Sequence, residues 1–342
     1  MRRDRDFSEF LKILRREGKP RYLPFFELLA SPGFIARRTN TPFDKMRWTD
    51  DGYWQIYVDF WLGMGYDNVP FEAPLRCPLP AGHGGTTEES EARVVFRSLE
   101  DYEKYAWPDE NNAVDLAPYE AIAKLLPPGV KMIAGVGGGP YEWAARMLGT
   151  VGLAYALADE PTLVELVFER LGKLHLSGLK QIAAMDGVGA LRQGDDLGFK
   201  TSTFISPAQL RHYVFPIYTR MVEASHAAGK PFILHSCGNL SKVYDDLIDT
   251  CHIDAKHSFE ETITPVEDFK AQYGKRVTPL GGLDVDLICR GTPEEIRAYT
   301  RDKIAKCFDD GYWALGTGNS LTNYMPVENY MIVIEEGLTV GN

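Results

Sequence analysis

Short apolar runs alternate along this chain with longer stretches in which apolar residues recur every three or four positions. A short apolar run that ends in glycine or a polar residue is typical of a strand buried in a parallel sheet, and the longer pattern is typical of an amphipathic helix. Eight such runs predict strands at residues 22–26, 68–71, 131–136, 189–192, 231–235, 252–255, 276–280 and 312–315. Eight strands separated by helices indicate an α/β fold, a (β/α)8 TIM barrel.

The helical pattern supplies the connections between these runs. Ser206-Pro207 and Thr292-Pro293 each place an N-cap residue before a first-turn proline, and Glu295 completes a capping box with Thr292. Further helices are predicted at 8–16, 140–147, 161–185, 240–251, 265–273 and 327–337. Residues 1–19 then form an N-terminal helical extension, and residues 78–115 form an insertion after the second strand. Because the pattern shows no second core and no repeat, we expect one domain over residues 1–342.

The composition narrows the class of protein. Of the 342 residues, 44% are hydrophobic and 25% charged, which is typical of a soluble globular chain. Lys and Arg number 37 against 48 Asp and Glu, and the net charge of −11 without a basic stripe argues against a nucleic-acid partner. No apolar window approaches the length of a membrane span. The five cysteines are odd in number and widely spread, so we expect reduced thiols and a cytoplasmic location.

Chemically useful residues follow most of the predicted strands. Barrel active sites lie at the C-terminal ends of the strands and in the loops that follow them. The residues at these positions are Glu27, Glu72, Gly138, Asp195, Asp196, His235, Cys237, Lys256, His257, Asp284, Thr317 and Asn319. We therefore expect one cavity at this rim, with His235, Cys237, Asp195, Glu72 and Asn319 around it.

His235 and Cys237 stand two residues apart at the end of a predicted strand. A strand repeats every two residues, so both side chains point the same way, and zinc accepts both imidazole nitrogen and thiolate sulfur. A catalytic zinc site needs a third protein ligand, and Thr317 is a poor one. A carboxylate would therefore have to serve as the third ligand, from Glu72, Asp195, Asp196 or Asp284. The alternative is a buried structural cysteine beside a hydrogen-bonded histidine.

Asp195 and Asp196 form a pair of carboxylates that could position a metal, orient a cation or donate a proton. A helix cap, or an ion pair with Lys200 or Arg192, would explain them equally well. Glu72 is a candidate catalytic carboxylate or a partner of Arg76.

Two weaker signals lie at the same rim. Lys256 and His257 supply a cation and a titratable group, or else a supporting contact such as a pair with Glu260. The turn around Gly138 opens a helix whose free amides could hold an anion, although an ordinary tight turn has the same sequence.

The blocks His235-Ser-Cys-Gly-Asn-Leu240, Gly281-Gly-Leu-Asp284 and Leu315-Gly-Thr-Gly318 resemble the uroporphyrinogen decarboxylase superfamily. Supporting blocks begin at Gly138, Asp195, Ile205 and Asp254, and the resemblance runs from about Pro20 to the C-terminus. The superfamily contains uroporphyrinogen decarboxylases and zinc-dependent corrinoid methyltransferases, all (β/α)8 barrels. From these rim positions and blocks together, we predict catalytic roles for Glu72, Asp195, Asp196 and His257. We also predict substrate or cofactor contacts at Gly138, Tyr141, Arg146, Lys256, Asp284, Thr317 and Asn319.

Several positions depart from the decarboxylase pattern. Decarboxylases of the superfamily carry an N-terminal arginine cluster that holds the porphyrinogen carboxylates, and the corresponding region here retains only Arg21. Their catalytic aspartate, active-site tyrosine and last-strand histidine fall at about Glu72, Arg146 and Thr317. A substrate with many carboxylates needs paired arginines in fixed geometry. These departures predict a protein that does not efficiently decarboxylate uroporphyrinogen III.

The methyltransferase branch binds zinc through His-x-Cys after the fifth strand and a cysteine after the eighth. His235 and Cys237 match the first two ligands, and Thr317 replaces the third. The leading expectation is therefore a zinc-dependent methyltransferase that moves a methyl group to or from a small molecule, with a corrinoid protein or free cobamide as methyl carrier. A carboxy-lyase and a non-catalytic small-ligand-binding barrel remain as alternatives, and a homodimer is a further expectation.

Overall fold

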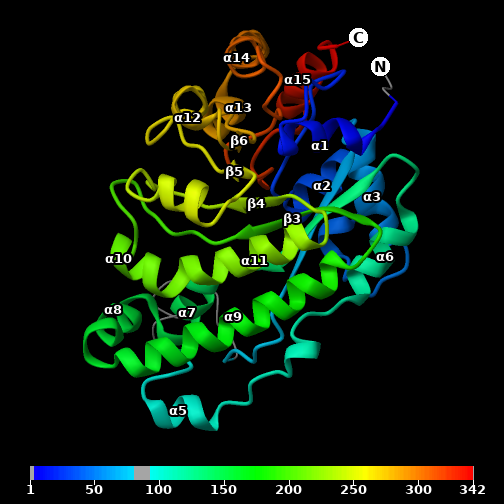
Figure 1. Ribbon diagram of the computed structural model, residues 1–342. Helices are drawn as coiled ribbons and strands as arrows, with labels where there is room; N and C mark the ends of the chain where they lie inside the picture. Colours follow the sequence, from blue (N-terminus) through cyan, green and yellow to red (C-terminus); the bar gives the residue numbers. More distant parts are fainter. Residues whose placement is uncertain (1–3, 81–92, 342) are drawn as a thin grey trace.

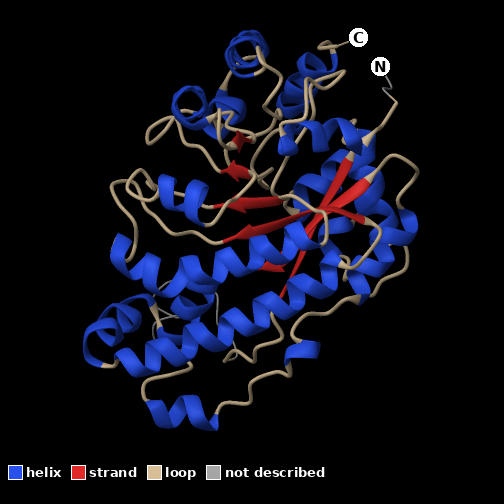
Figure 2. Ribbon diagram, in the orientation of Figure 1, coloured by secondary structure: helices blue, strands red, loops and turns tan. Residues whose placement is uncertain are grey.

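A computed structural model gives the fold of the chain and describes residues 4–80 and 93–341. Its centre is a parallel sheet whose strands follow one another in chain order, each paired with the next. The strands are β1 (Asn68–Pro74), β2 (Lys131–Gly137), β3 (Val188–Gly194), β4 (Phe232–His235), β5 (Ala255–His257) and β6 (Thr278–Pro279). Helices separate the strands, so the fold is α/β, as the sequence pattern predicts (Figure 2).

Two of the predicted strands, 22–26 and 312–315, are extended segments joined by single parallel bridges. Leu280 is bridged to Ala314, and Phe25 is bridged to Leu315, which continues the order of the sheet beyond β6. Proline has no N–H group to donate to a ladder, and Pro24 and Pro279 shorten the pairing at these places. The arrangement keeps the strand order of a (β/α)8 barrel.

The strand predicted at 252–255 is displaced along the chain. It begins only at Ala255 because His252 adopts a left-handed backbone with φ of 60°. This shift places His257 inside β5.

The helices cover the outside of the sheet, and α9 and α11 lie side by side along it (Figure 1). No helix in residues 4–80 and 93–341 has the length and apolar content needed to cross a bilayer. The helix predicted at 240–251 is only a short π-helical turn, η4 (Asp246–Thr250). The α-helices are α1 (Phe7–Arg15), α2 (Pro32–Thr39), α3 (Tyr53–Gly63), α5 (Leu99–Lys104), α6 (Ala117–Leu125), α7 (Pro140–Leu148), α8 (Thr150–Asp159), α9 (Pro161–Ala183), α10 (Pro207–Gln209), α11 (Phe215–Ala227), α12 (Val266–Tyr273), α13 (Val285–Arg290), α14 (Pro293–Cys307) and α15 (Val327–Leu338).

The inward face of the sheet has an apolar level that the N-terminal helix closes. One residue from each of seven extended segments joins the apolar face of α1 in a single cluster, formed by Phe7, Phe10, Ile13, Leu14, Phe26, Ile133, Ala190, Ile233, Ala255, Leu280 and Ala314. The contacts of α1 are with the N-terminal ends of the strands: Phe7 N donates to Gly129 O at 2.8 Å, and Thr278 Oγ1 donates to Ile13 O at 2.6 Å. The N-terminal extension is therefore part of the core.

Two residues further along the strands, the inward positions become polar. Glu72, Arg192, His235 and His257 each follow an inward-facing residue by two positions, because side chains alternate between the two faces of a strand. The polar level lies toward the C-terminal ends of the strands, where barrel sites form. The alternation thus places four polar side chains directly above the apolar cluster.

Replacement of Phe10 by alanine tests the role of α1. Phe10 is fully buried and stacks against Phe7 and Phe26, with ring centroids 5.7 and 6.3 Å apart. We expect Phe10→Ala to lower the free energy of unfolding by about 3–5 kcal/mol, because the cavity would lie in the closed end of the sheet. Leu11→Ala, at a partly buried position of the same helix, is the control. Equal urea midpoints for the two variants would show that α1 is not part of the core.

Candidate functional site

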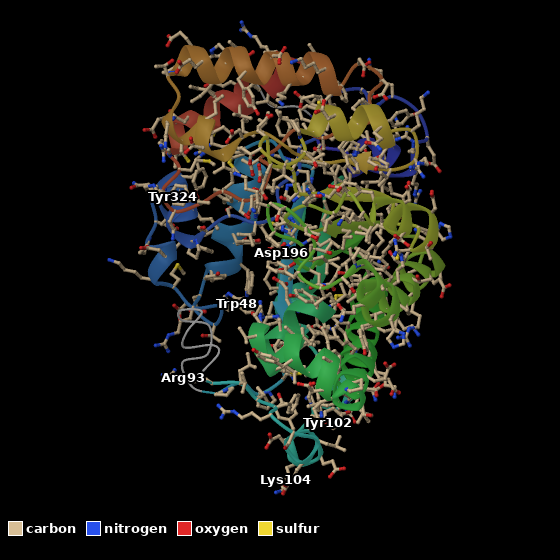
Figure 3. All side chains as sticks on the ribbon, turned by 90° about the vertical axis from the view of Figure 1, so that its left-hand side faces the viewer. Trp48, Arg93, Tyr102, Lys104, Asp196 and Tyr324 are labelled. Carbon is tan, nitrogen blue, oxygen red and sulfur yellow. The ribbon has the colours of Figure 1, made fainter. Side chains whose placement is uncertain are left out.

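Asp196, His235 and Cys237 form a compact cluster at the C-terminal end of the sheet. One ligand atom from each lies within 4.8 Å of the others. His235 Nε2 is 3.5 Å from Asp196 Oδ1 and 3.5 Å from Cys237 Sγ. The Cys237 backbone N–H also donates to Asp196 Oδ1 at 2.9 Å, which fixes the carboxylate against the loop. Figure 3 shows Asp196 near the middle of the face turned to the viewer, at a height between Trp48 and Tyr324.

The register of two neighbouring strands brings these residues together. Gly194 of β3 pairs with His235 of β4, so the residues two positions beyond each, Asp196 and Cys237, leave the sheet on the same face. Gly194 has no side chain, and a Cβ built there would meet only the His235 ring, at 3.9 Å. The common direction predicted for His235 and Cys237 thus corresponds to a separation of 3.5 Å between Cys237 Sγ and His235 Nε2 in the structure.

Asp196 and Cys237, the two acidic groups of the cluster, differ in charge. Burial works to raise the pKa of Asp196, but the contacts with His235 and with the Cys237 amide outweigh burial and lower this pKa to about 2. Burial, and then the nearby Asp196 carboxylate, raise the pKa of the Cys237 thiol to about 12. The cluster by itself therefore holds one carboxylate and one neutral thiol.

The donor set and its spacing fit zinc. Zn–S bonds of about 2.3 Å and Zn–N bonds of about 2.0–2.1 Å at a tetrahedral angle separate the two donors by roughly 3.5 Å. The observed separation of Cys237 Sγ and His235 Nε2 is 3.5 Å. One imidazole, one thiolate and one carboxylate give three protein ligands, the number that a catalytic site requires.

A second histidine stands directly behind the first. His235 Nδ1 lies 2.8 Å from His257 Nδ1, and His257 Nε2 lies 3.0 Å from the carbonyl oxygen of Thr317. His257 is fully buried, and burial lowers its pKa well below its usual range. His257, predicted as a catalytic residue, is thus enclosed behind His235.

Glu27 follows the extended segment 22–26, and Thr317 follows the neighbouring segment 312–315. The Thr317 N–H and hydroxyl donate to Glu27 at 2.6 and 2.7 Å, and the Tyr330 hydroxyl donates to Glu27 at 2.8 Å. Burial raises the pKa of Glu27 to about 7 against these three hydrogen bonds. The Thr317 hydroxyl is therefore committed to Glu27, and Asp196 is the carboxylate beside His235 and Cys237. The rim position of Glu27 was evident in the sequence, but its link to Thr317 was not.

Asp195 has a different surrounding from Asp196. It accepts hydrogen bonds from Tyr141 N at 3.0 Å, Glu142 N at 2.9 Å and the Tyr218 hydroxyl at 2.7 Å, and its side chain is buried. Burial and the neighbouring Glu142 raise its pKa. These are contacts of a helix cap, because two of the donors are free amides of the first turn of α7. In the structure the Asp195 carboxylate caps α7, and its predicted catalytic role stays a prediction.

Lys256 lies on the outer face of β5, opposite to His257. Its Nζ is 4.3 Å from the centroid of the Phe259 ring and donates to the carbonyl oxygens of Ser236 and Ser258. Burial lowers its pKa to about 7. Cys237 and Asp196 act on this ammonium group electrostatically, and the predicted substrate contact of Lys256 stays a prediction.

Glu72 forms an ion pair with Arg192 inside the sheet. Arg192 Nε and Nη2 lie 3.1 Å from Glu72 Oε2, and Nη1 donates to the carbonyl oxygen of Leu28. Arg76, considered as a partner of Glu72, pairs with Asp115 instead. The sequence signal for Arg192 was its place two residues after the inward-facing Ala190.

Three of the predicted contact residues lie around α7. The Gly138 carbonyl accepts from His175 and Gln193, Tyr141 is buried against Phe204, and Arg146 lies over the Trp143 ring. Glu142, which sequence reasoning missed, stands at the third position of α7 and is marked only by its capping contact with Gly139.

The remaining two predicted residues border a cavity at the rim. Asp284 caps α13, and Asn319 Nδ2 lies 3.4 Å from Cys237 Sγ. Both line a cavity of about 550 Å³ that Glu260, Glu261 and Tyr324 also border. Asn319 therefore connects this cavity with the cysteine of the cluster.

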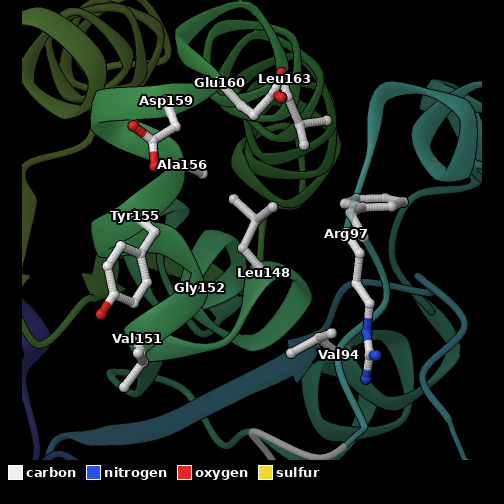
Figure 4. A pocket seen from close by; sticks show the side chains of 11 residues that line it. Val94, Arg97, Leu148, Val151, Gly152, Tyr155, Ala156, Asp159, Glu160 and Leu163 are labelled. Atoms are coloured by element: carbon white, nitrogen blue, oxygen red, sulfur yellow. The ribbon is translucent and has the colours of Figure 1, made fainter.

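A second cavity lies away from the predicted site residues. It measures about 400 Å³ and lies between α8 and the segment that contains Val94, Phe96 and Arg97 (Figure 4). None of the predicted site residues lines it.

Replacement of Glu27 by glutamine tests whether the pKa of this buried carboxyl group is raised. The folded-state pKa of about 7 lies above the ordinary 4.5, so the folded chain keeps a proton that the unfolded chain releases. The contribution to stability is greatest below about pH 4.5 and is lost as the pH rises through about 7. We expect Glu27→Gln to reduce this loss by on the order of 3 kcal/mol. Urea midpoints near pH 5 and pH 8 measure it, and parallel pH profiles for the two proteins would contradict the assignment.

The comparisons with known proteins concern the fold and the family of the chain. A methyltransferase from Methanosarcina mazei has a similar fold, with a TM-score of 0.70 and 14% sequence identity over 98% of this chain and 99% of that chain. At this identity the likeness concerns the fold alone. No curated protein matches the sequence. The sequence model of uroporphyrinogen decarboxylase (URO-D) matches residues 10–337. The chain therefore belongs to the uroporphyrinogen decarboxylase family.

Proposed function

We propose that this protein is a zinc-dependent methyltransferase that exchanges a methyl group between a small molecule and a corrinoid. The observation that carries the proposal is the cluster of Asp196, His235 and Cys237, in which His235 Nε2 lies 3.5 Å from each of the other two donor atoms, the separation expected at a tetrahedral zinc. The fold shared with the methyltransferase from Methanosarcina mazei is consistent with it.

The three residues have distinct roles in this proposal. His235 Nε2, Cys237 Sγ and an Asp196 oxygen would hold the zinc, which when bound acts as a Lewis acid that favours the thiolate form of a thiol. The Cys237 N–H holds the carboxylate in place, and Asn319 Nδ2 donates to Cys237 Sγ. Asp196 replaces Thr317 as the third ligand, because the Thr317 hydroxyl already donates to Glu27.

The contacts of Arg192 argue against the decarboxylase alternative. A tetrapyrrole with many carboxylates requires free guanidinium groups in the cavity. The guanidinium of Arg192, the arginine at the polar level of β3, is committed to Glu72 and to the carbonyl oxygen of Leu28. A non-catalytic binding barrel would not need three metal-binding side chains at one point.

The rest of the proposal concerns the surroundings of the reaction. We propose a corrinoid, carried by a partner protein or free, as the methyl carrier, and the cytoplasm as the location. All five cysteines are free thiols in the structure, as a reducing compartment allows. A homodimer stays a prediction.

Metal analysis of variants tests the zinc assignment. We expect about one zinc per chain in protein purified without chelator, and a loss of at least tenfold in zinc affinity in Asp196→Ala and Cys237→Ser, because each removes one of three ligands. Asp195→Asn is the matched control, since it changes the neighbouring carboxyl and affects the cap of α7. This control should keep zinc while its unfolding midpoint falls.

The same proteins test the reaction. We expect the wild type to methylate reduced cobalamin with a small methyl donor, or to demethylate methylcobalamin with a thiol acceptor, and Cys237→Ser to lose this activity. The cobalamin absorption spectrum, recorded without oxygen, follows the transfer. Efficient conversion of uroporphyrinogen III to coproporphyrinogen, or full zinc content in Cys237→Ser, would contradict the proposal.

A further inference from the structure

A continuous series of hydrogen bonds leads from the backbone of the last extended segment to the metal-binding nitrogen of His235. The Thr317 carbonyl oxygen lies 3.0 Å from His257 Nε2, and His257 Nδ1 lies 2.8 Å from His235 Nδ1. His235 Nε2 is the remaining ring nitrogen and faces Cys237 and Asp196. The order of these contacts determines where the protons lie.

The first proton is fixed by the carbonyl group. A carbonyl oxygen can only accept a hydrogen bond, so His257 Nε2 carries a hydrogen. A neutral imidazole has one N–H and one acceptor nitrogen, so Nδ1 of a neutral His257 is an acceptor. The two Nδ1 atoms are at hydrogen-bond distance, and the hydrogen between them must therefore belong to His235.

The opposite arrangement would place a charge in the core. If His257 donated from both nitrogens, it would be an imidazolium ion in a fully buried side chain. Its neighbours are the Phe26 ring, at 5.0 Å between centroids, and the uncharged Thr317 carbonyl. None of its hydrogen bonds within the described residues goes to a carboxylate that would offset that charge.

We propose that His257 is a positioning residue that holds a proton on Nδ1 of His235 and so reserves Nε2 as the metal ligand. The inference rests on the proposed function only in its second half, because the position of the proton can be measured without metal. It assigns to His257 a role that differs from the catalytic one expected from the sequence. Partners of this kind fix the orientation and tautomer of a metal-binding histidine.

The backbone around this hydrogen-bond series leaves room for the contact between His257 and Thr317. Gly281 has a left-handed backbone with φ of 65°, and a Cβ there would lie 2.2 Å from the Thr317 oxygen and 3.0 Å from His257 Nε2. Only glycine leaves room for this contact. Glu27 anchors the other side of the same peptide segment through the Thr317 N–H. Position 317, where the sequence resemblance implies a metal ligand, therefore serves here through its backbone.

The proton position can be measured by ¹⁵N NMR on histidine-labelled, zinc-free protein at mildly alkaline pH. We expect His235 to show a protonated Nδ1, and His257 to show a protonated Nε2 and an unprotonated Nδ1, with signals assigned from two variants that each lack one of these histidines. A His235 that carries its hydrogen on Nε2, with none on Nδ1, would overturn the inference. This readout does not depend on whether zinc binds.

Zinc affinity of position-257 variants tests the consequence. His257→Leu removes the acceptor, and we expect its zinc affinity in a chelator competition to fall about 10–100-fold. His257→Asn returns an oxygen near the place of Nδ1 and should recover most of that affinity. Thr300→Val, which removes a buried hydroxyl in α14 bonded to Ile296 O, is the control for loss of a buried polar group and should bind zinc as the wild type does.

The outcomes separate the two proposals. If the wild type binds no zinc but His235 carries the Nδ1 proton, the proposed function is wrong, and the inferred hydrogen bond from His235 to His257 is confirmed. If His257→Leu is folded by circular dichroism and binds zinc as tightly as the wild type, the positioning role is wrong. If His257→Leu does not fold, the NMR measurement on the wild type decides the inference.

Discussion

Inward-facing positions of the parallel strands share a confined space, and the chain fills them in two levels. Small and medium apolar side chains occupy the lower level, where α1 closes the end of the sheet. Charged and polar side chains occupy the next inward positions, and each must find a partner there, since an unpaired buried polar group costs about 1–3 kcal/mol. These partners are found within the site: Glu72 pairs with Arg192, and His257 contacts His235 and the carbonyl oxygen of Thr317.

The same requirement explains the state of the buried carboxyl groups. Burial removes Glu27 from water and raises its pKa to about 7. Three hydrogen bonds to the carboxylate oppose this shift but do not cancel it. Asp196 is partly exposed and has a charged or polar contact on each side, so its pKa falls to about 2. Both carboxyls follow extended segments, and Asp196 is the one whose pKa keeps it ionised throughout the neutral range, as a metal ligand must be.

Membership of the URO-D family concerns the fold of the whole chain, whereas the chemistry of the cluster concerns three side chains at its rim. The family match over residues 10–337 accounts for the fold. Relative to the ligand set that the sequence resemblance implies, Thr317 stands in place of a ligand residue within that fold. Thr317 has a backbone contact to His257 and a side-chain contact to Glu27, and Asp196 takes the place beside His235. A fold supports such exchanges because several loops meet at one rim.

The sequence by itself determined the α/β alternation and the common direction of His235 and Cys237, because both follow from local periodicity. Periodicity also marks the inward position of Arg192, although nothing in it identifies Glu72 as the partner. Only the tertiary structure separated Asp195 from Asp196 and Lys256 from His257. Neighbours in sequence leave a strand on opposite faces, and which face meets a helix and which meets the cavity depends on the register between strands. The hydrogen-bond series behind His235 joins residues that are 60 and 22 positions apart in the chain, and no local pattern encodes such contacts.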